Sequence, residues 1–132
     1  RRHIRSNNSW MHNSQRLVKG KGRCNAMIHP DDAKRLALAE GDDVVVSTPA
    51  GTITLPAWLC DDIMPGVISV PHGWGHDREG VLLAVARRVA GQSVNDIIGS
   101  NRVEAVTAMA QLNGIPVTVE PAKAPKRRKK AG

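Results

Sequence analysis

Residues 44–55 read VVVSTPAGTITL, and this stretch decides the fold class of the chain. Three consecutive valines are typical of a buried strand, and the residues TPAG at 48–51 favour a tight turn. Residues 52–55 then alternate between polar and apolar side chains, as a half-buried strand does. A β-hairpin is therefore expected here.

The segments around this hairpin also predict short elements. Residues 26–28 and 67–70 are short apolar runs, and residues 115–119 read as a closing strand. His29 is expected at the entry of a helix over residues 30–36, because Pro30 and two carboxylates occupy its first turn. Short strands at close spacing with little helix predict a small, mainly β barrel or sandwich.

Three further positions carry local expectations. The strand over 52–55 is expected to continue to Cys60, with Pro56 at a bulge or a sheet edge. The apolar spacing of residues 82–90 fits a helix that Gly91 would end. Trp58 is expected in the core, because it lies within this strand pattern.

Length and composition limit the class of protein. The chain has 132 residues, 41% hydrophobic and 23% charged, which suits one globular domain. No apolar run approaches the roughly 18 residues that a membrane span needs. Cys24 and Cys60 have neither the number nor the spacing of a disulfide framework or a zinc site, so two buried, reduced thiols in a cytoplasmic protein are expected. Arg1-Arg2 is followed by no apolar segment of the kind that export signals contain, so no targeting segment is expected.

The formal net charge of +7 is unevenly distributed. Residues 1–23 hold seven basic side chains and no acidic one, whereas residues 24–122 hold six basic and twelve acidic ones. Residues 122–132 add six more cations between Pro and Ala, which predicts a disordered basic tail after a domain over residues 1–121. The cations of the N-terminal block alternate with Ser, Asn and His, which are donors suited to an anion or a heterocycle.

The densest polar segment after this block is PHGWGHD at 71–77. His72 and His76 could ligate a metal or act as acid and base, although no third strong ligand stands nearby. Alternatively, glycines on both sides of Trp74 would let the backbone and the indole approach a flat ligand. No nucleophile elbow, Walker motif or dinucleotide glycine fingerprint is present.

Five segments, in order along the chain, carry a family resemblance. They are residues 5–13 (RSNNSWMHN), 29–33 (HPDDA), 41–46 (GDDVVV), 64–76 (MPGVISVPHGWGH) and 112–117 (LNGIPV). Together they resemble the C-terminal molybdopterin-dinucleotide-binding domain of the molybdenum oxidoreductases related to dimethyl sulfoxide reductase and formate dehydrogenase.

The resemblance implies a double-psi β-barrel with short helices that binds molybdopterin guanine dinucleotide. It implies that the chain is a fragment of a larger enzyme and inactive alone, because the preceding domains supply the molybdenum ligand; electron-transfer subunits are possible partners. Arg2 or Arg5 would neutralise phosphate. The other implied cofactor-binding residues are Ser6, Asn7, Asn8, Ser9, Trp10, His12, Asn13, His72, Trp74 and Asn95, with no catalytic residue and no metal ligand among them.

One alternative comes from a different functional class. A small basic β-barrel could bind nucleic acid through the N-terminal block and the Lys/Arg tail. The acidic middle of the chain and an aromatic content of 2% argue against it.

Overall fold

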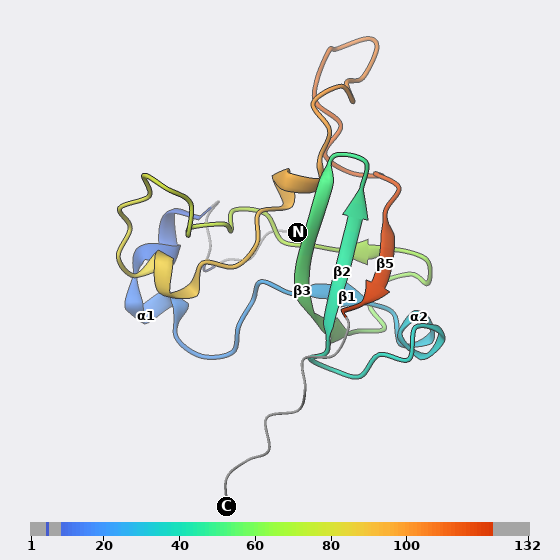
Figure 1. Cartoon of the computed structure of the whole chain (residues 1–132), viewed down its shortest axis with the longest axis horizontal. Helices are drawn as coiled ribbons and strands as arrows, with labels where there is room; N and C mark the ends of the chain where they lie inside the picture. Colours follow the sequence, from blue (N-terminus) through green and yellow to red (C-terminus); the bar gives the residue numbers. More distant parts are fainter. Residues whose placement is uncertain (1–4, 6–8, 123–132) are drawn as a thin grey trace, which may run out of the picture.

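The computed structural model describes Arg5 and residues 9–122, and the described part is mainly β. Its five strands form one sheet in the order β4-β1-β3-β2-β5 (Figure 1). The strands are β1 (Ala26–Ile28), β2 (Asp43–Thr48), β3 (Gly51–Leu59), β4 (Ile68–Ser69) and β5 (Thr118–Pro121). The helices are α1 (Gln15–Val18) and α2 (Pro30–Arg35), with three short 3₁₀ turns, η1 (Trp10–Asn13), η2 (Ala86–Val89) and η3 (Val94–Ile97).

The predicted hairpin is confirmed as β2 and β3. The two strands pair antiparallel, with Val44 opposite Leu55 and Val46 opposite Ile53. These four side chains are buried on the inner face, while the residues between them point outward. Alternation along each strand therefore builds the centre of the core.

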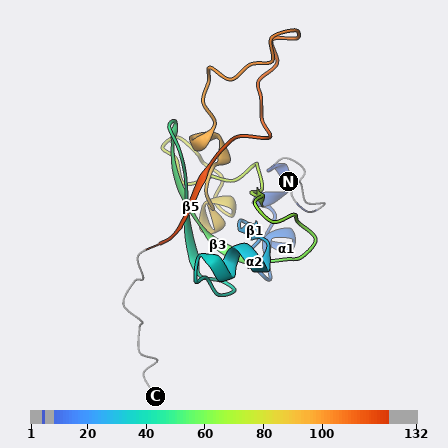
Figure 2. The ribbon, with the colours of Figure 1, turned by 90° about the vertical axis from the view of Figure 1, so that its right-hand side faces the viewer.

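β3 is long because its first residues pair with β2 and its last residues pair with β1. Pro56 lies opposite Asp43 at the end of β2, and from Ala57 onward β3 pairs in parallel with β1. Pro56, predicted at a bulge or a sheet edge, lies at the change of partner, where the pairing with β2 ends and the pairing with β1 has not begun. The change of partner bends the sheet, so that β1 and α2 lie to one side of the hairpin (Figure 2).

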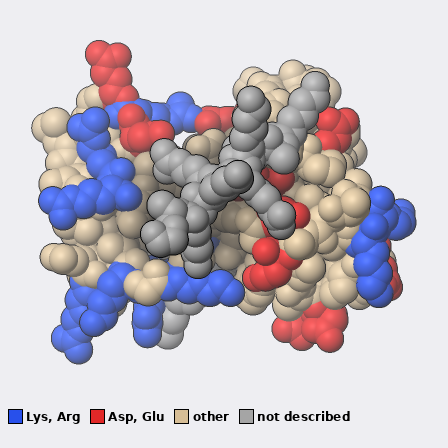
Figure 3. Space-filling view, turned by 60° about the horizontal axis from the view of Figure 1, so that its bottom comes forward, with Lys and Arg blue, Asp and Glu red and all other residues tan. Residues whose placement is uncertain are grey.

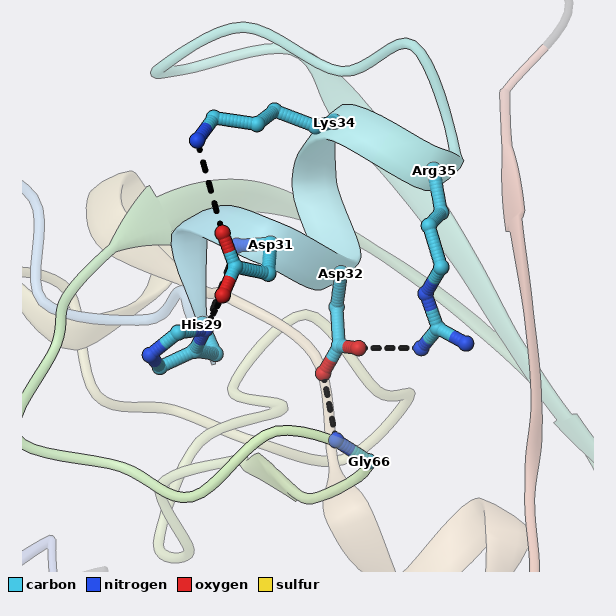
Figure 4. A network of polar contacts seen from close by, with 6 residues as sticks. All are labelled: His29, Asp31, Asp32, Lys34, Arg35 and Gly66. Carbon is cyan, nitrogen blue, oxygen red and sulfur yellow. Dashed lines mark hydrogen bonds and ion pairs between the residues drawn. The ribbon is translucent and has the colours of Figure 1, made fainter.

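The predicted helix after His29 is confirmed as α2, and a polar network fixes its start (Figure 4). His29 Nδ1 accepts a hydrogen bond from the Asp31 amide at 3.1 Å, which caps the helix. Asp32 accepts from the Gly66 amide at 2.6 Å and pairs with Arg35. These bonds, the Gly66 amide foremost, lower the pKa of Asp32 and tie α2 to the turn before β4.

Other expectations hold only in part or are wrong. Residues 82–90 contain η2 alone in place of a full helix, and the closing strand begins at Thr118. Trp58 is 36% exposed, because it alternates with the buried Ala57 and points away from the core. Cys24 and Cys60 were expected to be buried, and both are partly exposed.

The predicted basic tail, except for Ala122, lies outside the described residues. No helix in the described part of the chain is long and apolar enough to cross a membrane.

Candidate functional site

Three aromatic side chains meet where the N-terminal segment contacts the loop after β4. His12 of η1 is completely buried, and its ring stacks on Trp74 with centroids 3.9 Å apart and planes tilted by 30°. His12 Nδ1 lies 2.8 Å from His76 Nε2, so one nitrogen donates and the other accepts. We call His12, Trp74 and His76 the histidine cluster; it joins two segments 64 residues apart in the sequence.

Both histidines of the cluster are neutral at pH 7. Burial, followed by the nearby His76 and Arg23, lowers the pKa of His12 to about 4, against a smaller opposing effect of the Gly73 backbone. Burial also lowers the pKa of His76, although Asp77 and the Gly73 backbone oppose the shift. With both rings neutral, one proton lies between the two nitrogens and forms the hydrogen bond of the 2.8 Å contact.

Tight backbone packing holds the loop of residues 71–77 in place. The Gly75 amide donates to the Ala90 carbonyl at 2.8 Å, and a Cβ at Gly75 would meet Ser93 Cβ at 2.7 Å. A Cβ at Gly91 would lie 2.8 Å from Cys24 Sγ and 2.9 Å from the Trp74 ring. The glycines therefore let residues 90–93 close directly over the loop.

Cys24 and Gly91 support this site, although neither residue was predicted to belong to it. Cys24 Sγ accepts a hydrogen bond from the Gln92 amide at 3.3 Å. Gly91 could be recognised from the sequence only as a helix stop, since its contact with Trp74 depends on the tertiary fold.

The predicted N-terminal residues have differing environments. Trp10 is exposed, and Ser9 precedes η1 in a left-handed conformation. Asn13 Oδ1 accepts from the Val85 and Ala86 amides at 3.0 and 3.2 Å, so this oxygen helps to hold η2 against η1. Arg5 is exposed, and Arg2, Ser6, Asn7 and Asn8 lie outside the described residues.

Asn95 lies apart from the histidine cluster. It belongs to η3, which packs on β3 and β2 near the tip of the hairpin, whereas η1 packs against η2 beside α1 (Figure 1). Asn95 is exposed and lines a cavity of about 560 Å³ together with residues 48–50 and 96–102. The fold therefore places His12, Trp74 and His76 together, with the partly buried His72 on the same loop, and Asn95 at a second location.

The charge is also divided in space. Lys and Arg side chains gather mainly at the left of the face in Figure 3, and Asp and Glu are more frequent at the right. Exposed cations of α1, its C-cap and η2, which lie at the left in Figure 1, include Arg16, Lys19, Arg87 and Arg88. The end of the molecule that holds α1 and η2 is thus the more cationic end.

The polar groups of the N-terminal sequence fit a phosphorylated, heterocyclic ligand. His12 Nε2 is buried and forms no hydrogen bond with any described residue. Residues 1–23 supply guanidinium, amide and hydroxyl donors and no carboxylate, which suits a diphosphate. Among the described residues, no three His, Cys, Asp or Glu side chains gather in a way that could hold a metal ion.

Comparison with known proteins identifies relatives of the chain. Residues 1–116 match the family model described as "Molydopterin dinucleotide binding domain". A tetrathionate reductase subunit of Salmonella typhimurium is 29% identical over 70% of this chain and 11% of its own length. The arsenate respiratory reductase molybdopterin-containing subunit of Chrysiogenes arsenatis is 34% identical over 66% of this chain and 10% of its own.

A solved structure shows the same fold. Acetylene hydratase from Pelobacter acetylenicus superposes with a TM-score of 0.68 at 21% identity, over 84% of this chain and 16% of that one. The chain spans about a tenth of the length of the two reductase subunits. Since the family model covers most of the sequence, this chain belongs to the molybdopterin dinucleotide-binding domain family.

Proposed function

We propose that this chain binds molybdopterin guanine dinucleotide as one domain of a larger molybdenum oxidoreductase. The observation that carries the proposal is the contact between His12 and His76, which joins two of the segments that resemble the family's cofactor segments. Both segments lie within the residues that match the family model. The reductase relatives and their length support a larger parent subunit.

In this proposal the chain's own residues bind and orient the cofactor and do not react with it. Arg2 or Arg5 neutralises the diphosphate, and the hydroxyl and amide groups of residues 6–9 form hydrogen bonds with the pterin or the diphosphate. The histidine cluster keeps η1 and the loop of residues 71–77 in fixed relative positions. The other proposed cofactor contacts are Trp10, His12, Asn13, His72, Trp74 and Asn95. When bound, the cofactor supplies the redox chemistry through its molybdenum.

Several finer features belong to the same proposal. The curved sheet and the superposition on acetylene hydratase support a β-barrel, for which we propose the double-psi form. We propose that the domain comprises residues 1–121, that residues 122–132 form a basic tail, and that the parent enzyme resembles formate dehydrogenase and is cytoplasmic. Electron-transfer subunits would be its further partners.

A titration of the isotope-labelled chain with GDP tests cofactor binding, with backbone amide shifts as the readout. We expect saturable shifts in residues 5–13 and 71–77 and around Asn95, because GDP reproduces the guanine and diphosphate part of the cofactor. CDP serves as the matched nucleotide. Equal shifts with CDP would contradict the guanine form and leave dinucleotide binding supported.

Two variants that each remove one positive charge test whether Arg5 contributes to GDP binding. Arg5→Gln removes a proposed phosphate contact and should weaken GDP binding several-fold, whereas Lys34→Gln removes an exposed cation of α2 and should leave it unchanged. A short DNA duplex tests the nucleic-acid alternative. Salt-dependent shifts with DNA in the N-terminal block and tail, without shifts for GDP, would refute the proposed function.

A further inference from the structure

Residues 99–114 form an arm that projects away from the sheet, clear of all five strands in both ribbon views (Figures 1 and 2). Its two legs are held together by an antiparallel bridge between Val103 and Ala110. The Glu104 amide donates to the Met109 carbonyl, and the Gln111 amide donates to the Arg102 carbonyl, both at 2.9 Å. The arm is therefore an ordered hairpin-like element.

The arm exposes apolar side chains where a solvated loop would carry polar ones. Every residue from 101 to 114 is exposed. Four of the ten exposed large apolar side chains of the described residues lie on it, namely Val103, Val106, Met109 and Leu112. Its only charged residues are Arg102 and Glu104, which cancel. An exposed apolar cluster of this kind marks a contact surface.

Concave surfaces flank the base of the arm. A cavity of about 480 Å³ is lined by residues 112–117 and 66–70 together with Val94, Ile97 and Ile98. A second, of about 560 Å³, is lined by residues 99–102 and 115–116 together with the hairpin turn. A partner that received the arm could place its own side chains in either cavity, so the contact surface continues from the arm onto the barrel.

We infer that the arm docks into an apolar groove of the remainder of the reductase subunit. The inference rests on the proposed function, since the occupant is the rest of that subunit. The length of the relatives supports this occupant, because about nine-tenths of each reductase subunit lies outside the part that this chain matches. The absence of net charge on the arm favours an apolar protein surface over a polyanion.

Hydrogen exchange of residues 101–112 tests the inference, compared between the isolated chain and the complete subunit. We expect exchange at least about tenfold slower in the subunit, because docking buries the legs and removes local opening. Equal exchange in both states would overturn the inference. Molybdenum and pterin content, measured on the same subunit, reports separately on the proposed function: an empty subunit with a protected arm would refute the function and leave the docking intact.

Two matched double variants test whether the apolar side chains of the arm make this contact. Val106→Ser with Met109→Ser changes side chains that are 91% and 67% exposed, and Leu82→Ser with Met64→Ser changes two others that are 90% and 69% exposed. Neither pair should alter the thermal midpoint of the isolated chain. In the subunit, only the arm pair should restore fast exchange at residues 101–112, and equal effects of both pairs would contradict the inference.

Two further outcomes would identify a different occupant. If the isolated chain sediments as a dimer that the arm variant dissociates, the arm binds a second copy. If the arm variant abolishes binding of the isolated chain to phosphatidylcholine vesicles, the arm binds lipid. Either result would overturn docking into the subunit.

Discussion

Lowering the pH should destabilise the chain through the histidine cluster. The pKa of His12 falls from 6.5 to about 4 on folding, and that of His76 is lowered as well. As the pH falls below 6.5, the unfolded chain binds a proton at His12 that the folded chain does not bind. The free energy of unfolding should therefore be constant above about pH 7 and decrease between pH 6.5 and 4.

The size of the effect follows from the His12 pKa. The change in the His12 pKa from 6.5 to about 4 corresponds to about 3 kcal/mol of unfolding free energy, at about 1.4 kcal/mol for each tenfold change in proton affinity. Lowering the pH from 6.5 to 5 should therefore reduce the free energy of unfolding by about 2 kcal/mol. Solvent that reaches the N-terminal segment would reduce this loss of unfolding free energy. Protonation of His76 would increase the loss, because its pKa is lowered as well.

Urea unfolding at pH 8, 7, 6 and 5, followed by tryptophan fluorescence, measures this loss. His12→Gln removes the titrating group and should flatten the dependence on pH by about 2 kcal/mol across the range. Gln111→Asn, on an exposed residue, changes no titrating group and leaves the cluster intact, so it should keep the wild-type slope. If His12→Gln and the wild type lose the same free energy between pH 8 and 5, the assignment of the shift to His12 is refuted.

Three further variants test the packing around the site. Gly91→Ala should cost about 1–3 kcal/mol by thermal unfolding because its Cβ meets Cys24 and Trp74, whereas Gly22→Ala, in open space, should cost little. Asn13→Ala should speed hydrogen exchange of the two amides at the start of η2 and cost about 1–2 kcal/mol; unchanged exchange would show that its oxygen holds nothing. Asp32→Asn should lower the thermal midpoint at pH 7, and the difference should vanish as the pH falls below 3.8 and the wild-type carboxylate takes up its proton.

Local sequence determined the elements whose signals lie within a few residues. The hairpin of β2 and β3 could be predicted from strand alternation around the TPAG turn, and α2 from the Pro and carboxylates of its first turn. Alternation alone also fixes which hairpin side chains share a face, because successive residues of a strand point to opposite sides. The family resemblance, too, came from segments readable in order along the chain, and the family-model match confirms it.

The tertiary structure decided how those elements combine. Trp58 was predicted in the core and points outward, because burial depends on which face of β3 is covered. Pro56 fits a central strand only because β3 changes partner beside it. His12 meets His76 across 64 residues, and its low pKa arises from the burial that this meeting creates. Periodicity records the preference of each residue for its neighbours along the chain, whereas contacts between distant segments depend on the closed fold.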